Sequence, residues 1–315
     1  MTRSLRSVFF IPALAAALLL AACGGGSDNN AVQSVPSISV PATEAGAPQV
    51  TGNMATDGFN WFNYRRQQLG LQLLARNTQI NAAAQSHSDY QKLNGSITHE
   101  EIPGKPGFTG ETLLERLNAV GYLFPSQNGY AYGEVISSTG NIPGASAAED
   151  LITAIYHRFV IFEPMFKDGG AGAAGNPGSY TYFTVDFATN NLNGGLGRGN
   201  LVTYPFANQT GVPIIFYSDY ETPDPVQDRN EVGYPISIHT DITSSVTVQS
   251  FTVTPRGGTP LSTRLLSHDT DAQTPASNAA IIPISVLTGA TLYDVQFTGS
   301  VDGIAVSRSW TFQTR

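Results

Sequence analysis

The octapeptide YTYFTVDF, residues 180–187, is a run of aromatic and β-branched side chains that follows a glycine-rich loop. Such a run is typical of a β-strand. Upstream of it, apolar residues recur with the period of an α-helix. One helix is expected over residues 146–159, because the sequence SAAE at its start has the spacing of a capping box and apolar residues follow. Helices and strands are therefore mixed within one folded unit.

The sequence changes character after the glycine-rich segment 194–199. Beyond it, short runs of Val, Ile, Phe and Thr lie between Pro, Gly, Asp and Asn, which favours a small β-sandwich. The strands are expected near residues 214–217, 236–239, 246–254, 280–284, 292–298 and 309–313. The chain has 315 residues, a length that suits two folded units. We expect them over residues 57–195 and 201–315.

The N-terminal segment, residues 1–22, has the features of an export signal. Two arginines precede an apolar run that ends at Leu20, and small residues follow where a signal peptidase would cut. The apolar run is too short to span a bilayer comfortably. The next 34 residues, 23–56, are rich in Gly, Ser, Asn, Pro and Ala, and we expect them to form a flexible linker.

Leu20-Ala21-Ala22-Cys23 resembles the lipobox of bacterial lipoproteins, in which the cysteine is acylated and becomes the mature N-terminus. Acyl chains on Cys23 would hold the protein on a lipid bilayer, since each buried methylene contributes about 0.8 kcal/mol. Gly24 after the cysteine resembles the outer-membrane sorting pattern. The resemblance implies an exported lipoprotein of the bacterial cell envelope. The alternative is an ordinary signal peptide with an incidental cysteine.

The composition excludes several kinds of site. The chain has 24 acidic and 16 basic residues, a net charge of −8, and no cluster of Lys and Arg. Nucleic-acid binding lacks the basic surface it would need, and an acidic substrate is disfavoured for the same reason. The single Cys rules out both an internal disulfide and an all-cysteine metal site.

Four residues of the first unit have side chains that can carry chemistry: His87, His99, Glu134 and His157. Imidazole and carboxylate groups bind zinc or a similar divalent cation, and they also act as acids and bases when folding brings them together. Each histidine also has a plain structural alternative. His87 lies on an apolar helical stripe, which suits a hydrogen-bonded core histidine. His157 beside Arg158 could cap the C-terminal end of its helix.

Residues 60–187 resemble the bacterial, cysteine-poor branch of the CAP superfamily, which is named for cysteine-rich secretory proteins, antigen 5 and plant pathogenesis-related proteins. The resemblance depends on several short motifs that occur in the family's order. They are Asn63, Arg66 and Gly70-Leu71; AAAQSHSD at 82–89; THE at 98–100; Arg116; Gly121-Tyr122; GEVI at 133–136; His157-Arg158; and the closing strand at 180–187.

The resemblance implies an α+β fold, a three-layer α-β-α sandwich whose central cleft gathers His and Glu side chains. His99 matches the first cleft histidine, Glu134 the cleft glutamate, and His157 the histidine of the bacterial motif. A second glutamate of animal members falls near Ala154 and has no counterpart. With His87, these residues would make a three-His, one-Glu set that is adequate for zinc or another divalent cation. His99, Glu134 and His157 are its candidate metal ligands.

The end of the chain resembles a bacterial immunoglobulin-like domain. The resemblance depends on AIIP at 280–283, Leu287, LYDV at 292–295 and WTFQT at 310–314. It implies an all-β immunoglobulin-like sandwich after the first unit. Such modules act as spacers or binding surfaces.

Three functions remain open from the sequence. The favoured one is a tethered binding protein that holds a lipid, a sterol or a cell-wall ligand in the His/Glu cleft. The second is a metal-dependent hydrolase or peptidase that uses the same cleft, although no nucleophile or HExxH-like spacing supports it. The third is a structural or adhesive surface protein. On the sequence alone, an enzymatic function is therefore less favoured than a non-enzymatic one.

Overall fold

The computed structural model describes residues 16–17 and 44–315, except residues 126–128, 141 and 176–179. The predicted signal peptide and Cys23 therefore lie outside the described residues, apart from the two residues of strand β1 (Ala16–Ala17). Within the described part of the chain, no helix has both the length and the apolar content needed to cross a bilayer.

The first unit is built on a five-stranded sheet with the strand order β1-β3-β5-β4-β2. Its three long strands, β3 (Ala131–Thr139), β4 (Asp168–Gly175) and β5 (Thr181–Thr189), pair antiparallel with β5 in the middle. The two-residue strands β1 and β2 (Ala75–Arg76) pair in parallel at the edges. The aromatic run at 180–187 thus supplies most of the central strand, which confirms its prediction.

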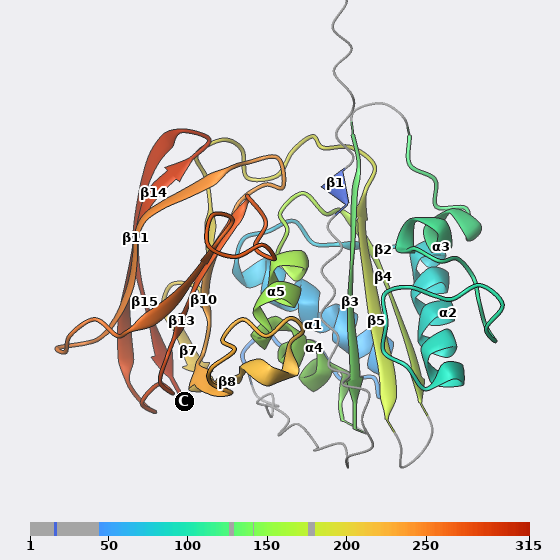
Figure 1. Ribbon diagram of the computed structural model, residues 1–315, viewed down its shortest axis with the longest axis horizontal. Helices are drawn as coiled ribbons and strands as arrows, with labels where there is room; N and C mark the ends of the chain where they lie inside the picture. The colour runs from blue at the N-terminus through green and yellow to red at the C-terminus, as the bar shows by residue number, and fades with distance from the viewer. Residues whose placement is uncertain (1–15, 18–43, 126–128, 141, 176–179) are drawn as a thin grey trace, which may run out of the picture.

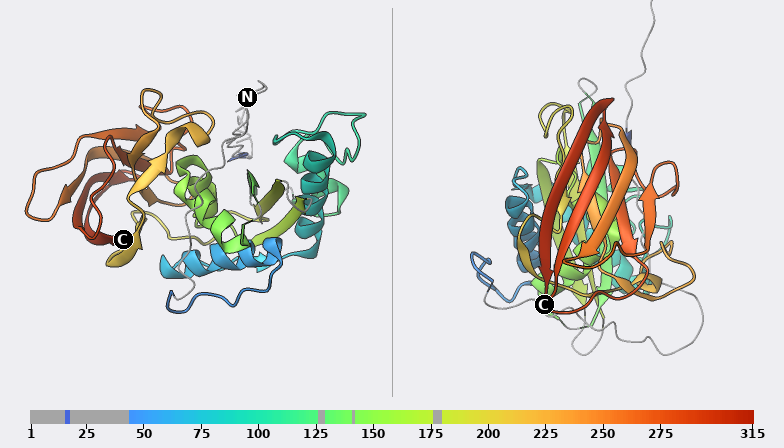
Figure 2. Two further views of the ribbon diagram at one scale, coloured as in Figure 1. Left: turned by 90° about the horizontal axis from the view of Figure 1, so that it is seen from below. Right: turned by 90° about the vertical axis from the view of Figure 1, so that its left-hand side faces the viewer.

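Helices cover both faces of this sheet. On one face lie α2 (Thr78–Asn94) and α3 (Leu113–Ala119), and on the other lie α1 (Met54–Gln68), α4 (Gly144–Thr153) and α5 (Ile155–Ile161) (Figure 1, Figure 2). The expected three-layer α-β-α sandwich is confirmed.

The helix expected over residues 146–159 is in fact two helices, α4 and α5. They meet at Ala154, whose extended backbone (ψ 118°) interrupts the helical hydrogen bonding. The expected capping box is wrong, because α4 already begins at Gly144 and Ser146 lies buried inside it. Gly144 permits the close contact between α4 and α1, since a Cβ there would overlap the backbone of α1.

Glycines of β4 allow α2 to lie close against the sheet. A Cβ on Gly170 would overlap the backbone of Asn81, and a Cβ on Gly172 would overlap the backbone of Gln85. Both of these contacts are with α2, which packs along β4 and also touches β5. The close packing brings the side chains of α2 directly onto the two strands.

The C-terminal unit consists of two stacked four-stranded sheets and a small two-stranded one (Figure 1). The first sheet has the order β12-β13-β10-β6, the second β11-β14-β15-β7, and the third pairs β8 with β9. The elements are β6 (Val202–Tyr204), β7 (Gln209–Val212), β8 (Ile215–Tyr217), the 3₁₀-helix η1 (Ser218–Tyr220), β9 (Glu231–Gly233), β10 (Ile236–His239), β11 (Val246–Pro255), β12 (Thr263–Ser267), β13 (Asn278–Pro283), β14 (Leu292–Val301) and β15 (Ile304–Thr314).

The expected β-sandwich is confirmed, and each of the six expected strands overlaps an observed one. The sequence analysis missed the short strands β6, β7 and β9 and the five-residue strand β12. The likeness to an immunoglobulin domain and the boundary between the two units stay predictions.

The two units share one hydrophobic core. A single cluster of buried apolar side chains includes Phe62 and Phe159 of the first unit and Tyr204 and Ile238 of the second. Burying such side chains contributes about 25 cal/mol per Å² of apolar surface, so the contact between the units adds to the stability of both.

Arg158 of α5 ties the two units together by polar contacts. The side chain is fully buried, and its Nη1 donates to the backbone oxygen of Pro235 over 2.7 Å. Its Nε donates to the backbone oxygen of Ile152 over 2.6 Å. The guanidinium carbon also lies 4.9 Å from the ring centroids of Tyr204 and of Tyr234. A buried guanidinium with these partners fixes the position of the second unit on the first.

Glu163, just after α5, is a second polar link between the units. Its Oε1 accepts hydrogen bonds of 3.0 Å from the backbone nitrogens of Met165 and Ile242. Burial raises the pKa of Glu163 to about 8; the two backbone hydrogen bonds and Arg66 oppose this rise, and the nearby Asp241 adds to it. The carboxyl group is therefore protonated in the folded protein at neutral pH.

A pH-dependent stability follows from Glu163. Its folded pKa lies above the unfolded value of about 4.3, so its stabilising contribution is full below about pH 4 and is lost as the pH rises towards 8. In urea unfolding, we expect the stability of the wild type relative to Glu163→Gln to fall by up to about 1.4 kcal/mol per pH unit in that window. Glu231→Gln, at an exposed position of β9, is the control and should follow the wild type. Parallel profiles for the wild type and Glu163→Gln would contradict the prediction.

Candidate functional site

Three side chains from separate segments meet on one face of the first sheet: Glu134 of β3, Arg116 of α3, and His99 from the segment between α2 and α3. The Nδ1 atom of His99 lies 2.8 Å from Oε1 of Glu134, and Nη2 of Arg116 donates to Oε2 of Glu134 over 2.8 Å. Nη1 of Arg116 also donates to the backbone oxygen of His99 over 2.8 Å. We call these three residues the Glu134 site.

The alternation of side chains along β3 determines which way Glu134 points. A Cβ on the preceding residue, Gly133, would lie against the side chain of Val160 in α5. Since successive strand residues point to opposite faces, Glu134 points to the face covered by α2 and α3. Its contacts with His99 and Arg116 lie on that face.

Local helix signals position the other two residues. Helix α2 ends at Asn94, and its C-cap Gly95 has the left-handed conformation (φ 61°) that glycine adopts without strain; the chain then continues to His99. Helix α3 begins with a capping box, in which Thr112 and Glu115 satisfy each other's backbone groups. Arg116 follows directly, so a well-defined helix start aims its guanidinium at β3.

The Glu134 carboxylate is buried, and its negative charge is balanced by nearby groups. Only 1% of Glu134 and 1% of Arg116 are exposed, against 9% of His99. Burial alone would raise the pKa of Glu134, but the charge of Arg116, the charge of His87 and the hydrogen bond with His99 together hold it below its ordinary value. Glu134 is therefore an ionised carboxylate at neutral pH.

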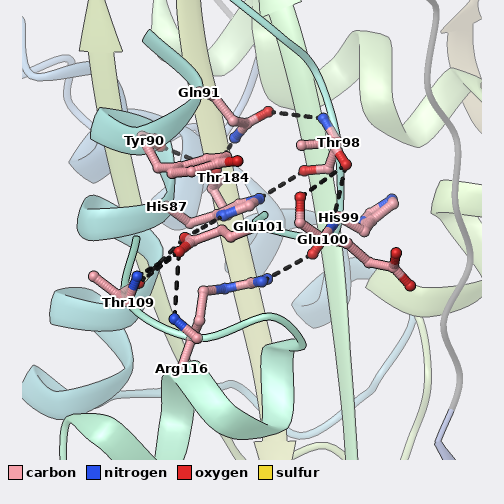
Figure 3. A network of polar contacts seen from close by, with 12 residues as sticks. His87, Tyr90, Gln91, Thr98, His99, Glu100, Glu101, Thr109, Arg116 and Thr184 are labelled. Atoms are coloured by element: carbon pink, nitrogen blue, oxygen red, sulfur yellow. Dashed lines mark hydrogen bonds and ion pairs between the residues drawn. The ribbon is translucent and has the colours of Figure 1, made fainter. Parts of the chain in front are cut away.

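His87 lies next to the Glu134 site but bonds elsewhere (Figure 3). Its Nδ1 is 2.9 Å from Oε1 of Glu101, and its Nε2 is 2.7 Å from the backbone oxygen of Thr98. The Glu101 carboxylate also accepts hydrogen bonds from the backbone nitrogens of Thr109 and Gly110. His87 thus fastens the segment between α2 and α3 to α2, as the core-histidine alternative describes.

His157 is not brought to the Glu134 site by any polar contact within the described residues. Its Nδ1 lies 3.3 Å from Oε1 of Glu221, which comes from the C-terminal unit. The same carboxylate accepts from the backbone nitrogens of Ile155 and Tyr156 over 2.8 and 2.6 Å. The alternative that His157 caps the C-terminal end of its helix is wrong, because it lies in the first turn of α5.

The described residues contain no group of three or more His, Cys, Asp or Glu side chains that could hold a metal ion. The atoms of the candidate residues that would have to coordinate a metal ion already take part in other bonds. Both oxygens of Glu134 already bond to His99 and Arg116, and His157 bonds to Glu221. As arranged, His99, Glu134 and His157 therefore do not fit a divalent cation.

The sequence analysis missed three acidic residues: Glu101 and Glu221, which bond to His87 and His157, and Asp186, which stands opposite Glu134 in the sheet. The period-2 alternation along the strand at 180–187 could have pointed to Asp186, since it pairs with Glu134 across β3 and β5. No local pattern pointed to Glu221, because its partners precede it by 64 to 66 residues.

The Glu134 site leaves one hydrogen-bonding atom of His99 unused. The Nε2 atom is buried and has no partner among the described residues. The Glu134 carboxylate can only accept, so it holds the Nδ1 of His99 as a donor, which leaves Nε2 as an acceptor in the neutral ring. Buried polar groups without a partner are uncommon and often mark a site that a ligand or water completes.

Removing Arg116 tests the compensation of Glu134. We expect Arg116→Leu to lower the free energy of unfolding by about 3–5 kcal/mol, because it leaves a buried carboxylate unpaired. The double variant Arg116→Leu/Glu134→Leu should lose less than Arg116→Leu alone. Arg264→Leu, which breaks an exposed ion pair with Asp228, is the control and should cost at most about 1 kcal/mol. A double variant that loses at least as much as Arg116→Leu would show that Arg116 does not compensate Glu134.

The comparisons with known proteins concern the first unit. The model of the cysteine-rich secretory protein family, CAP, matches residues 59–187. No curated protein sequence matches the chain.

Solved structures that are similar to this chain include the following two. One is an outer surface protein from Borrelia burgdorferi, with 16% identity, 42% of this chain and 88% of that chain covered, and a TM-score of 0.35. The other is an extracellular protein containing a SCP domain from Bacillus anthracis str. Ames, with 25% identity, coverage of 47% and 44%, and a TM-score of 0.36. The chain therefore spans less than half the length of the Bacillus anthracis protein.

The family match coincides with the three-layer unit that carries the Glu134 site, and the β-rich C-terminal region is additional to it. The chain therefore contains a domain of the cysteine-rich secretory protein (CAP) family over residues 59–187.

Proposed function

We propose that this protein is an exported, membrane-tethered CAP-domain lipoprotein that binds a lipid or another cell-envelope ligand at the Glu134 site. The observation that supports it best is the buried Nε2 of His99, which has no partner among the described residues. Glu134 holds the ring of His99, and Arg116 holds Glu134, so this atom has a fixed position. Such a preorganised acceptor binds a ligand with little loss of side-chain entropy.

The hydrogen-bonding role of Nε2 of His99, an acceptor, limits the chemical classes of ligand that could bind there. A hydroxyl or amide group could donate to Nε2 of His99, and sterols, sugars and cell-wall peptides carry such groups. An anionic ligand fits less well, because Glu134 is ionised beside the ring and the chain carries a net charge of −8. The proposed ligand is therefore an uncharged, hydroxyl- or amide-bearing molecule of the envelope.

A metal-dependent hydrolase is the alternative from the same residues. A carboxylate that orients one histidine nitrogen and leaves the other free is common beside metal ions. Here, however, Glu134 would have to release His99 or Arg116 before it could become a ligand itself. Zinc retention in near-stoichiometric amounts, lost in both His99→Ala and Glu134→Ala, would favour this alternative.

Ligand capture tests the binding function. Full-length mature protein is incubated with an extract of envelope lipids, repurified, and its bound molecules are identified by mass spectrometry. We expect His99→Ala to retain at least about tenfold less ligand, since a buried hydrogen bond contributes about 1–3 kcal/mol. The matched control is His268→Ala in the C-terminal unit, which should retain the wild-type amount. Equal retention by His99→Ala, or no ligand on any variant, would argue against the proposal.

The tether is tested separately by Cys23→Ala. Without the acylated cysteine, we expect the protein to move from the membrane fraction to the soluble fraction of fractionated cells, because the apolar acyl chains supply the membrane affinity. Ser27→Ala in the same segment is the control and should stay with membranes. Continued membrane association of Cys23→Ala would refute lipidation at this residue.

A further inference from the structure

Strand β3 has an outer side that faces away from β5, and within the described residues only the two-residue strand β1 pairs with it (Figure 1). The pairing is parallel and joins Ala16 and Ala17 to Ala131 and Tyr132. On its inner side, β3 pairs with β5 along its whole length. The rest of the outer side, residues 133–139, therefore has no strand partner in the part of the chain that the structure describes.

Strand β1 lies in the segment 1–22, which the proposed export removes from the mature protein. Ala131 and Tyr132 then lose the partner of their outer side. Both residues are buried in the structure, 0% and 8% exposed. Backbone N–H and C=O groups at such a position need a hydrogen-bond partner, and an edge strand that lacks one is a template for an added strand.

His99 lies beside the same edge. Figure 3 shows it next to β3 on the side away from β5, and its Nδ1 contacts Glu134, two residues after Tyr132. A strand added to β3 runs about 4.8 Å from it. If that strand keeps the register of β1, the residue two places after the partner of Tyr132 stands opposite Glu134. Its side chain then shares the face on which His99 contacts Glu134.

The surroundings of the edge favour an apolar, uncharged strand. The ring centroids of Phe124 and Tyr130 lie 4.5 Å apart at the start of β3, and those of Tyr130 and Tyr132 lie 6.2 Å apart. Phe124 and Tyr130 are only partly buried, so apolar side chains of an added strand can pack on their rings. Strand β1 itself belongs to an apolar run, LAAALL at residues 14–19.

We propose, resting on the binding function and the export proposed above, that the outer edge of β3 in the mature protein binds an extended, uncharged peptide segment as an added parallel strand. Backbone hydrogen bonds to β3 supply the affinity. The peptide side chain opposite Glu134 supplies the specificity, because Nε2 of His99 takes a hydroxyl or amide donor there. Strand β1 is the internal occupant of this edge until the segment 1–22 is removed.

Fluorescence anisotropy of the mature protein, residues 23–315, tests the added strand. The probe is a labelled peptide LAAALN with a polar tail, which is residues 14–19 with Leu19→Asn. The control peptide also carries Ala16→Pro and Ala17→Pro. Alternate residues of a strand turn their N–H groups to one side, so one of the two prolines removes a donor to β3. We expect the control to bind at least about tenfold more weakly. Equal binding of both peptides, or binding of neither, would overturn the proposal.

The role of His99 is tested by comparing LAAALN with LAAALL, which has no side-chain donor opposite Glu134. The ratio of the two affinities should fall at least about threefold in His99→Ala, while both peptides still bind through their backbones. His268→Ala in the C-terminal unit is the control and should keep the wild-type ratio. An unchanged ratio in His99→Ala would show that His99 does not select the peptide.

The full chain of 315 residues, produced without export, tests the competition with β1. We expect it to bind LAAALN at least about tenfold more weakly than the mature protein, because a tethered competitor has a high effective concentration. The same chain with Ala16→Pro and Ala17→Pro should regain binding. A full chain that binds as tightly as the mature protein would contradict competition for one edge.

Hydrogen exchange of the mature protein locates the bound peptide. The backbone amides of residues 131–139 should gain protection with LAAALN, and those of β4, near the opposite edge of the sheet, should not. Protection at β4 alone would place the peptide elsewhere and overturn the proposal. No lipid enters these measurements. A failed lipid capture therefore leaves peptide binding standing, and a failed peptide titration leaves lipid capture standing.

Discussion

The first unit depends on the compensation of one buried charge. Glu134 sits on a strand of the sheet where only 1% of its surface reaches solvent, and it is tolerable there because Arg116 and His99 bond to it. The three residues belong to a strand, a helix and the segment before that helix. The same contacts that neutralise the carboxylate therefore hold the α2/α3 layer in register with the sheet and fix the ring of His99.

On the other face of the sheet, a buried carboxylate also holds a helix in place. The α4–α5 break at Ala154 exposes the first backbone N–H groups of α5, and Glu221 of the second unit accepts from them. Arg158, one residue after His157, reaches across to the second unit in the opposite direction. Glu221 of the second unit thus bonds to the first unit, and Arg158 of the first unit bonds to the second. The two units also share one hydrophobic core.

Local patterns in the sequence predicted the order of elements well, because helical spacing and β-branched runs reflect burial on one face. The C-terminal sandwich follows from such patterns, whereas the three-layer unit was implied by the family resemblance, which depends on short motifs such as Gly133-Glu134 and His157-Arg158. The partners of the site residues could not be predicted in this way. His87 and His157 bond to Glu101 and Glu221, because pairing depends on which carboxylates the topology brings near. Sequence order does not report that distance, so the expectation that all four residues share one cleft went beyond what spacing can show.

The contact between Glu221 and α5 bears on how the chain is made. Under the proposed export from the N-terminus, residues 155–157 would cross the membrane well before residue 221, and the backbone donors at the start of α5 would wait for that carboxylate. The CAP unit would then complete its structure only when much of the following unit has also crossed. Folding of the two units after export would therefore be cooperative. A chain that terminates before residue 221 would leave the first backbone N–H groups of α5 without their partner, and this end of the helix would be open to proteases.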